Sequence, residues 1–190
     1  MVDDVIRVLG GAIRGRKLRG PKGLQFRPTT GRVKEFVFSF LGNEMEGVRI
    51  LDLFAGSGAL GIEALSRGAE EVIFVERSFQ NINLIQANLK LCGFSDRTKV
   101  IRGDVFREIK RFGQKGEKFD LILADPPFLE NERDRIVTRV DQSQILNEEG
   151  FLIIEHISGD PDFEKHRMKL MKQRQFGHCM VSIYHPQAGE

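Results

Sequence analysis

One segment, residues 48–65, restricts the fold of this chain more than any other part of the sequence. Its first six residues form a short apolar run that is typical of a buried strand, and its last residues have a helical pattern. The turn between them has the glycine spacing G-x-G-x-x-G, with Gly56, Gly58 and Gly61. Glycine lets the backbone turn tightly and approach a ligand, and the start of a helix presents free N–H groups. This segment therefore predicts a strand–loop–helix unit that binds a nucleotide-like cofactor.

The rest of the chain continues the alternation of strand and helix. Strands are expected at residues 72–75, 99–103, 119–124 and 151–155, and helices at 30–41, 78–91 and 132–146. Two closing strands, 168–175 and 180–184, are joined around Gly177. Such alternation predicts an α/β fold with a mostly parallel sheet covered on both faces, and the closing hairpin adds one antiparallel strand. At 190 residues, a single domain over residues 1–190 is expected.

Acidic residues lie at or just past the carboxyl ends of three expected strands, 48–53, 72–75 and 99–103, and their positions favour a cofactor site at one edge of the sheet. Glu76 lies roughly 20 residues past the glycine loop, where an acid can bind a ribose hydroxyl pair. Asp52 would repel a pyrophosphate but favours the cationic amino group of S-adenosylmethionine, and Asp104 can accept from an adenine amine. A dinucleotide remains an alternative cofactor. The alternatives to ligand binding are capping of nearby N–H groups for Asp52 and a helix cap for Asp104. The predicted cofactor-binding residues are Asp52, Phe54, Ala55, Gly56, Ser57, Gly58, Glu76 and Asp104.

A second motif, Asp125-Pro126-Pro127-Phe128, follows the apolar run 119–124. Two consecutive prolines cannot continue a strand, so the chain must break there. The break leaves a carboxylate, a free carbonyl and an aromatic ring at the carboxyl end of a strand, where open α/β sheets bind ligands. Two acceptors beside a flat apolar face suit a planar amine, although an ordinary strand-end turn is the alternative. We take these four residues as the candidate catalytic site.

Charge is distributed unevenly along the chain. Residues 1–35 contain nine Lys and Arg and three acids, which leaves the other 155 residues with a net charge of −4 within a total of +2. A hairpin followed by a helix is expected in residues 1–42, and its charge predicts an extension that docks on a polyanion. A solvated basic arm without a partner is the alternative. The candidate contacts to nucleic acid are Arg14, Arg16, Lys17, Arg27, Arg32 and Lys34.

Other function classes find no support in the sequence. No apolar stretch approaches the roughly 20 residues that span a bilayer, and the acidic start lacks a signal-peptide core. Cys92 and Cys179 are too few for a disulfide framework, and no Cys/His cluster has zinc spacing. We therefore expect a cytoplasmic protein without a metal site.

Several motifs together resemble the bacterial RsmD-type methyltransferases, over nearly the whole chain. They are Arg14-Gly15-Arg16-Lys17-Leu18, Arg27-Pro28-Thr29-Thr30, Arg32-Val33-Lys34-Glu35, the glycine loop from Leu51 to Gly61, and Asp125-Pro126-Pro127-Phe128. The Arg-Pro-Thr-Thr segment is the most specific of these, and Gly31 departs from the family, which usually has an acid there.

The resemblance implies a Rossmann-like class I methyltransferase fold with seven strands, the last antiparallel. It implies S-adenosylmethionine as cofactor, and methylation of the exocyclic N2 amine of one guanine in 16S ribosomal RNA, within the small subunit, as the reaction. Asp125 and the Pro126 carbonyl would accept the amine hydrogens, and Phe128 would stack on the base. The alternatives are a DNA adenine-amine methyltransferase, a non-catalytic RNA-binding assembly factor on the same fold, and a dinucleotide oxidoreductase.

Overall fold

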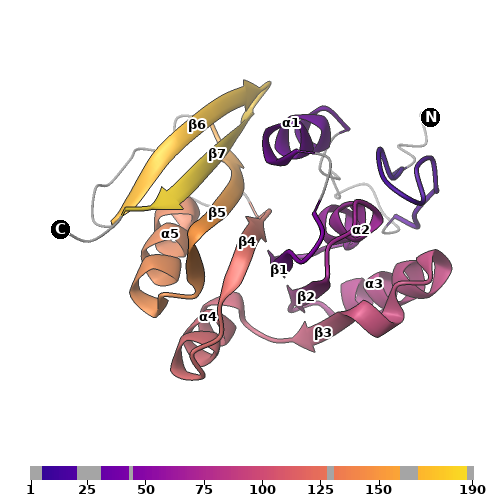
Figure 1. Ribbon diagram of the computed structural model, residues 1–190, viewed down its shortest axis with the longest axis horizontal. Helices are drawn as coiled ribbons and strands as arrows, with labels where there is room; N and C mark the ends of the chain where they lie inside the picture. The colour runs from indigo at the N-terminus through magenta and orange to yellow at the C-terminus, as the bar shows by residue number, and fades with distance from the viewer. Residues whose placement is uncertain (1–5, 21–30, 43–44, 128–130, 159–166, 188–190) are drawn as a thin grey trace.

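A twisted seven-stranded sheet with helices on both faces forms the centre of the protein (Figure 1). The computed structural model describes residues 6–20, 31–42, 45–127, 131–158 and 167–187. The strands are β1 (Arg49–Leu53), β2 (Glu71–Glu76), β3 (Thr98–Arg102), β4 (Phe119–Ala124), β5 (Leu146–Ile157), β6 (Met168–Phe176) and β7 (Cys179–Pro186). The α-helices are α1 (Gly31–Leu41), α2 (Ala59–Ser66), α3 (Phe79–Cys92), α4 (Val105–Gln114) and α5 (Glu132–Ser143).

The strand order is β3-β2-β1-β4-β5-β7-β6. β1 to β5 pair in parallel, whereas β7 is antiparallel to both β5 and β6. The predicted seven-stranded, mostly parallel sheet with an antiparallel last strand is therefore confirmed. Because the order reverses between β1 and β4, the carboxyl ends of these two strands frame the place where open α/β sheets bind ligands.

Two apolar cores hold the layers together. One core packs α1, α2 and α3 against one face of the sheet, and the other packs α4 and α5 against the opposite face. Side chains alternate between the cores along the central strands, as in β1, where Ile50 belongs to the first core and Leu51 and Leu53 to the second. Burial on both faces explains why the central strands have continuous apolar runs in the sequence.

Two boundaries differ from the sequence prediction by three residues or more. The helix expected over 132–146 ends at Ser143, because Gln144 takes a left-handed conformation with a φ of 49°. Leu146 is then the first residue of β5, where it pairs with Phe119 of β4. The helix α4, which was not predicted from the sequence, follows β3.

The N-terminal residues 6–20 fold back on themselves and pack beside α2 (Figure 1). Arg7 and Lys17 form an antiparallel bridge, flanked by the backbone hydrogen bond from Leu18 N to Ile6 O at 2.8 Å. This arrangement agrees with the predicted hairpin, although only the one bridge has ladder geometry. Ile6, Val8 and Leu18 are buried in the same core as α1, α2 and α3.

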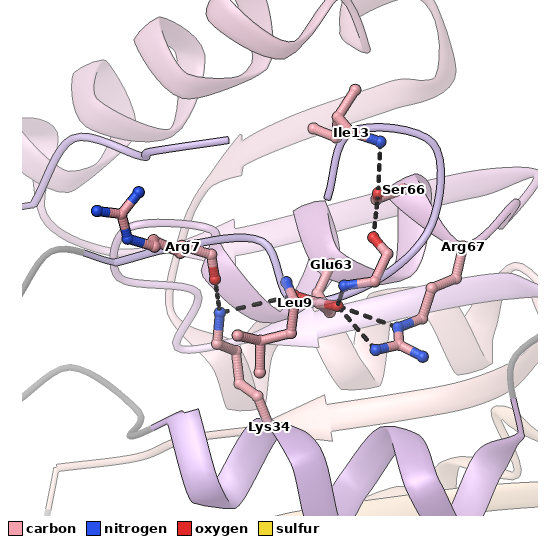
Figure 2. A network of polar contacts seen from close by, with 8 residues as sticks. Arg7, Leu9, Ile13, Lys34, Glu63, Ser66 and Arg67 are labelled. Atoms are coloured by element: carbon pink, nitrogen blue, oxygen red, sulfur yellow. Dashed lines mark hydrogen bonds and ion pairs between the residues drawn. The ribbon is translucent and has the colours of Figure 1, made fainter. Parts of the chain in front are cut away.

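A buried carboxylate on α2 anchors this segment (Figure 2). Glu63, with no exposed surface, accepts hydrogen bonds from Leu9 N at 2.7 Å and Gly10 N at 2.8 Å. It also pairs with Lys34 of α1 at 3.6 Å and with Arg67 at 3.0 Å. One side chain thus joins the hairpin, α1 and α2, which fixes the N-terminal segment against the helix that follows the glycine loop.

Candidate cofactor and substrate site

A hollow of about 1110 Å³ opens at the carboxyl ends of β1, β2, β3 and β4. Ten of the predicted cofactor and catalytic residues line it, which are Asp52, Phe54, Ala55, Gly56, Ser57, Glu76, Asp104, Asp125, Pro126 and Pro127. Gly58 lies behind this lining, where it precedes the first residue of α2. Phe128 lies outside the described residues. The structure therefore brings the glycine loop and the Asp-Pro-Pro turn to one cavity.

The glycine loop needs left-handed backbone at three positions. Gly56 and Gly58 have φ values of 54° and 76°, and Phe54 has a φ of 56°, which is uncommon for a residue with a side chain. Such strain is concentrated at functional sites in folded proteins. The third glycine of the motif, Gly61, serves packing, because a Cβ there would collide with the ring of Phe74 on β2.

Glu76 ends β2 with its carboxylate turned toward the glycine loop. One oxygen accepts from Gly56 N at 2.9 Å, and the other accepts from Arg77 N and Ser78 N, both at 2.8 Å. A carboxylate offers about four acceptor positions, so these three bonds leave capacity for a ligand hydroxyl. Glu76 thus shapes the loop while it faces the cavity.

Asp52 is 1% exposed, and it accepts a hydrogen bond from Gly61 N at 3.0 Å. Capping of a nearby N–H group, the alternative that the sequence left open, is therefore observed, although the residue also lines the cavity. Burial raises the pKa of Asp52 well above its usual range; the Gly61 bond opposes the shift, and the charges of Asp125 and Glu76 add to it. Three acids around one hollow favour a cationic ligand.

Asp104 caps α4, because its side chain accepts from Arg107 N at 3.1 Å. The helix cap that the sequence left open as an alternative is therefore also observed. The residue is exposed at the cavity wall, and a contact with an adenine amine stays a prediction.

The Asp-Pro-Pro turn follows β4 directly. Asp125 is half-buried, and its backbone N–H donates to Leu53 O of β1 at 3.4 Å, which ties the turn to the strand that leads into the glycine loop. Pro126 is buried and Pro127 is exposed. Two prolines in succession restrict the backbone here, so Asp125 is held at the edge of the cavity by rigid chain on one side and by β1 on the other.

Sequence reasoning missed several residues of the cavity wall. Phe106 packs edge-on against Phe54 at 6.4 Å between ring centroids, and the Arg135 guanidinium lies 4.4 Å from the Phe106 centroid. Phe79 is 60% exposed at the start of α3. Phe79 and Phe106 come two or three residues after a strand-end acid, and that position was the signal available in the sequence. The other missed lining residues include Arg77, Asn81, Arg102 and Glu132.

The predicted RNA contacts are only partly at the surface. Arg14, Arg16, Lys17 and Arg32 are exposed, and Arg27 lies outside the described residues. The prediction for Lys34 is wrong, because this side chain is 2% exposed and its ammonium bonds to Arg7 O and pairs with Glu63 (Figure 2). Burial lowers the pKa of Lys34, and the Glu63 carboxylate opposes that shift.

Among the described residues, no group of three His, Cys, Asp or Glu side chains is arranged to hold a metal ion. Within the same residues, no helix combines the length and apolar character that a membrane span requires.

Comparisons with known proteins agree with this geometry. The family model described as conserved hypothetical protein 95 matches residues 6–185. The chain is 42% identical over 151 residues to a putative rRNA methyltransferase, YlbH, of Bacillus subtilis, covering 80% of this chain and 82% of that protein. It is 32% identical over 180 residues to the ribosomal RNA small subunit methyltransferase D of Haemophilus influenzae, covering 94% and 93%.

A solved structure shows the same fold. The putative methyltransferase yhhF from Escherichia coli superposes with a TM-score of 0.84 at 29% identity, covering 97% of this chain and 99% of that one. The predicted class I methyltransferase fold is thereby confirmed. From the family match and these relatives, the chain belongs to the conserved hypothetical protein 95 family, that of the RsmD-type methyltransferases.

Proposed function

We propose that this protein transfers a methyl group from S-adenosylmethionine to the exocyclic N2 amine of a guanine in 16S ribosomal RNA. The observation that carries the proposal is the shared cavity, which joins the glycine loop and Glu76 to the Asp125-Pro126-Pro127 turn. A hollow that holds both the methyl donor and the acceptor amine suits direct transfer of the methyl group between the two bound molecules. The names of the relatives support ribosomal RNA as the substrate.

The cofactor would lie along the glycine loop. Glu76 has acceptor capacity for a ribose hydroxyl, and Asp52 favours the cationic methionine end. The same acids oppose a pyrophosphate, which argues against a dinucleotide in this hollow. When bound, S-adenosylmethionine supplies an electrophilic methyl group.

The chain's own task is then to present the amine. The lone pair of a guanine amine is delocalised into the ring, so the amine is a weak nucleophile. The Asp125 carboxylate and the Pro126 carbonyl would accept its two hydrogens and turn the lone pair toward the methyl group. Because Asp125 is held between β1 and two prolines, this alignment is in place before the base arrives, and positioning of this kind is a major source of rate.

The base must leave its stack to reach Asp125, as enzymes that act on bases generally require. Phe128 is proposed to stack on the extruded base. Arg14, Arg16, Lys17, Arg27 and Arg32 are proposed to contact phosphates, while Lys34 is left out because it is buried. The hairpin turn is hydrogen-bonded to Ser66, the last residue of α2. The length of this helix puts Ser66 about 12 Å from the glycine loop, so the RNA would extend well beyond the cavity.

The direct test is methyl transfer from labelled S-adenosylmethionine to three substrates, which are small subunits that lack the modification, naked 16S RNA and DNA. We expect transfer to a ribosomal substrate and none to DNA. Transfer to DNA alone would favour the adenine-amine alternative. Tight cofactor binding without transfer to any RNA would favour the assembly factor. The predicted cytoplasmic location stays a prediction.

A further inference from the structure

β6 presents an exposed basic face that the proposed function has not used. Its side chains are exposed from Lys169 to Gln175, and Lys169, Lys172 and Arg174 are its charged residues. None of the carboxylates in the described part of the chain forms an ion pair with Lys172 or Arg174. These two cations on one strand leave a net positive surface at this edge of the sheet.

Aromatic rings hold these two cations on the α1 face of the sheet. The Lys172 ammonium lies 5.5 Å from the ring centroid of Phe36 and 5.8 Å from that of Phe40. The Arg174 guanidinium lies 5.6 Å from the Phe36 centroid and 5.3 Å from the Phe176 centroid. Contacts of this kind orient a cation without neutralising it.

The strand register places Arg174 at the same level along the sheet as the Asp-Pro-Pro turn. Ala124 of β4 pairs with Ile154 of β5, so the residues that follow them, Asp125 and Glu155, lie at the same level. Glu155 pairs with Val181 of β7, and Val181 pairs with Arg174 of β6. Three strand spacings of about 4.8 Å separate β4 from β6, which gives roughly 14 Å across the sheet. The cation is therefore within a few nucleotides' reach of Asp125.

The same face continues onto α1. Phe36 packs edge-on against Phe176 at 5.6 Å, and Figure 1 shows α1 beside the β6–β7 hairpin. Arg32 precedes Phe36 by one helical turn and shares its side of the helix. The exposed acid of this turn, Glu35, faces away, because it lines a hollow with Arg7 and Arg14 on the hairpin side.

We propose that Lys172 and Arg174, together with Arg32, form a second docking surface for RNA phosphates. This inference rests on the proposed function and extends it. The N-terminal hairpin packs beside α2, and β6, which carries Lys172 and Arg174, lies beyond β5 and β7 (Figure 1). The RNA is thereby held on both sides of the Asp125 turn, so the target base is presented between two fixed points.

Two alternative roles for Lys172 and Arg174 lead to different expected results. Edge strands often carry Lys or Arg to prevent pairing with another sheet, and long cationic side chains also shield aromatic rings. In either role, the two charges would be irrelevant to RNA affinity.

The test is the salt dependence of binding to a 16S ribosomal RNA transcript by the double variant Lys172→Gln and Arg174→Gln, which keeps much of each stem. We expect weaker binding, and a log–log salt slope that falls by about 0.7 for each lost contact. The control is Lys110→Gln with Lys115→Gln, which removes the same charge from exposed positions on and just after α4, on the opposite face. Its salt slope should equal that of the wild type.

Affinity for S-adenosylhomocysteine and the melting temperature should be unchanged in the double variant, and Arg174→Lys alone should retain the wild-type slope. An unchanged slope in the double variant, or an equal fall in the control, would overturn the inference. A new dimer in sedimentation with an unchanged slope would identify edge protection instead. If the wild type itself neither binds nor methylates ribosomal RNA, the proposed function fails, which is a separate result.

Discussion

At the residue scale, Asp125 carries the chemistry of the proposed reaction. It lies at the cavity edge with its backbone tied to Leu53, so replacing its side chain leaves the turn in place. Asp125→Ala should slow single-turnover methyl transfer by about 100-fold or more, the range for a residue that handles a reacting proton. Affinity for S-adenosylhomocysteine, measured by calorimetry, should change only a few-fold. Near-normal transfer by the folded variant would remove Asp125 from the mechanism.

Asp52 gives the site a pH dependence. Because burial raises its pKa, Asp52 is neutral below that raised value and ionised above it. A cationic ligand prefers the ionised form, so affinity for S-adenosylhomocysteine should rise as pH increases through the raised pKa. Asp52→Asn keeps an acceptor for Gly61 N but has no charge, so it should bind more weakly and lose this rise.

Calorimetric titrations from about pH 5 to pH 7, below the range of about 7.7–8.0 in which α-amino groups titrate, measure the effect. The free energy of unfolding should change with pH in the opposite direction. A folded protein becomes less stable as an acid with a raised folded-state pKa ionises. Asp52→Asn should therefore be at least as stable as the wild type at neutral pH. If the variant kept the same rise in affinity with pH, another group would be responsible.

At the scale of elements, α3 connects the cofactor loop to the N-terminal segment through one buried amide. Asn88 has no exposed surface; its oxygen accepts from Arg19 N at 2.8 Å, and its amide nitrogen donates to Arg19 O and Ser57 O, both at 3.0 Å. Ser57 belongs to the glycine loop and Arg19 to the end of the basic hairpin. The two proposed binding surfaces therefore share a support.

Asn88→Ala should lower the free energy of unfolding by about 1–3 kcal/mol, because backbone groups lose their partners. It should also weaken both S-adenosylhomocysteine and RNA binding, since the loop and the hairpin lose a common anchor. Asn83→Ala, at an exposed position of the same helix, is the matched control and should change neither. Denaturant unfolding and calorimetry give the two readouts. Loss of stability with intact affinity for both ligands would limit Asn88 to a structural role.

At the scale of the whole molecule, the sequence best predicts those strands and helices whose bounds are determined by neighbouring residues alone. The strand 119–124 was predicted with the bounds that the structure has, because an apolar run meets two prolines that end it. The helix ending at Ser143 was predicted three residues too long, because Ile145 and Leu146 continue an apolar pattern past a left-handed turn at Gln144.

Partners that come from distant parts of the chain could not be predicted. Lys34 counted as a surface charge in the sequence, but Glu63 of α2 draws it into the interior. The charge of a short sequence segment does not reveal the contact of Lys34 with Glu63, because this contact depends on how the helices pack on the sheet.

The proposed reaction is defined by which atom receives the methyl group, and nucleoside analysis of the product measures this directly. Small subunits that lack the modification are incubated with the protein and labelled S-adenosylmethionine, and the RNA is digested and separated. We expect label in N2-methylguanosine from 16S RNA with the wild type, and almost none with Asp125→Ala. Label in N6-methyladenosine, or equal label in N2-methylguanosine from both proteins, would contradict the proposed reaction.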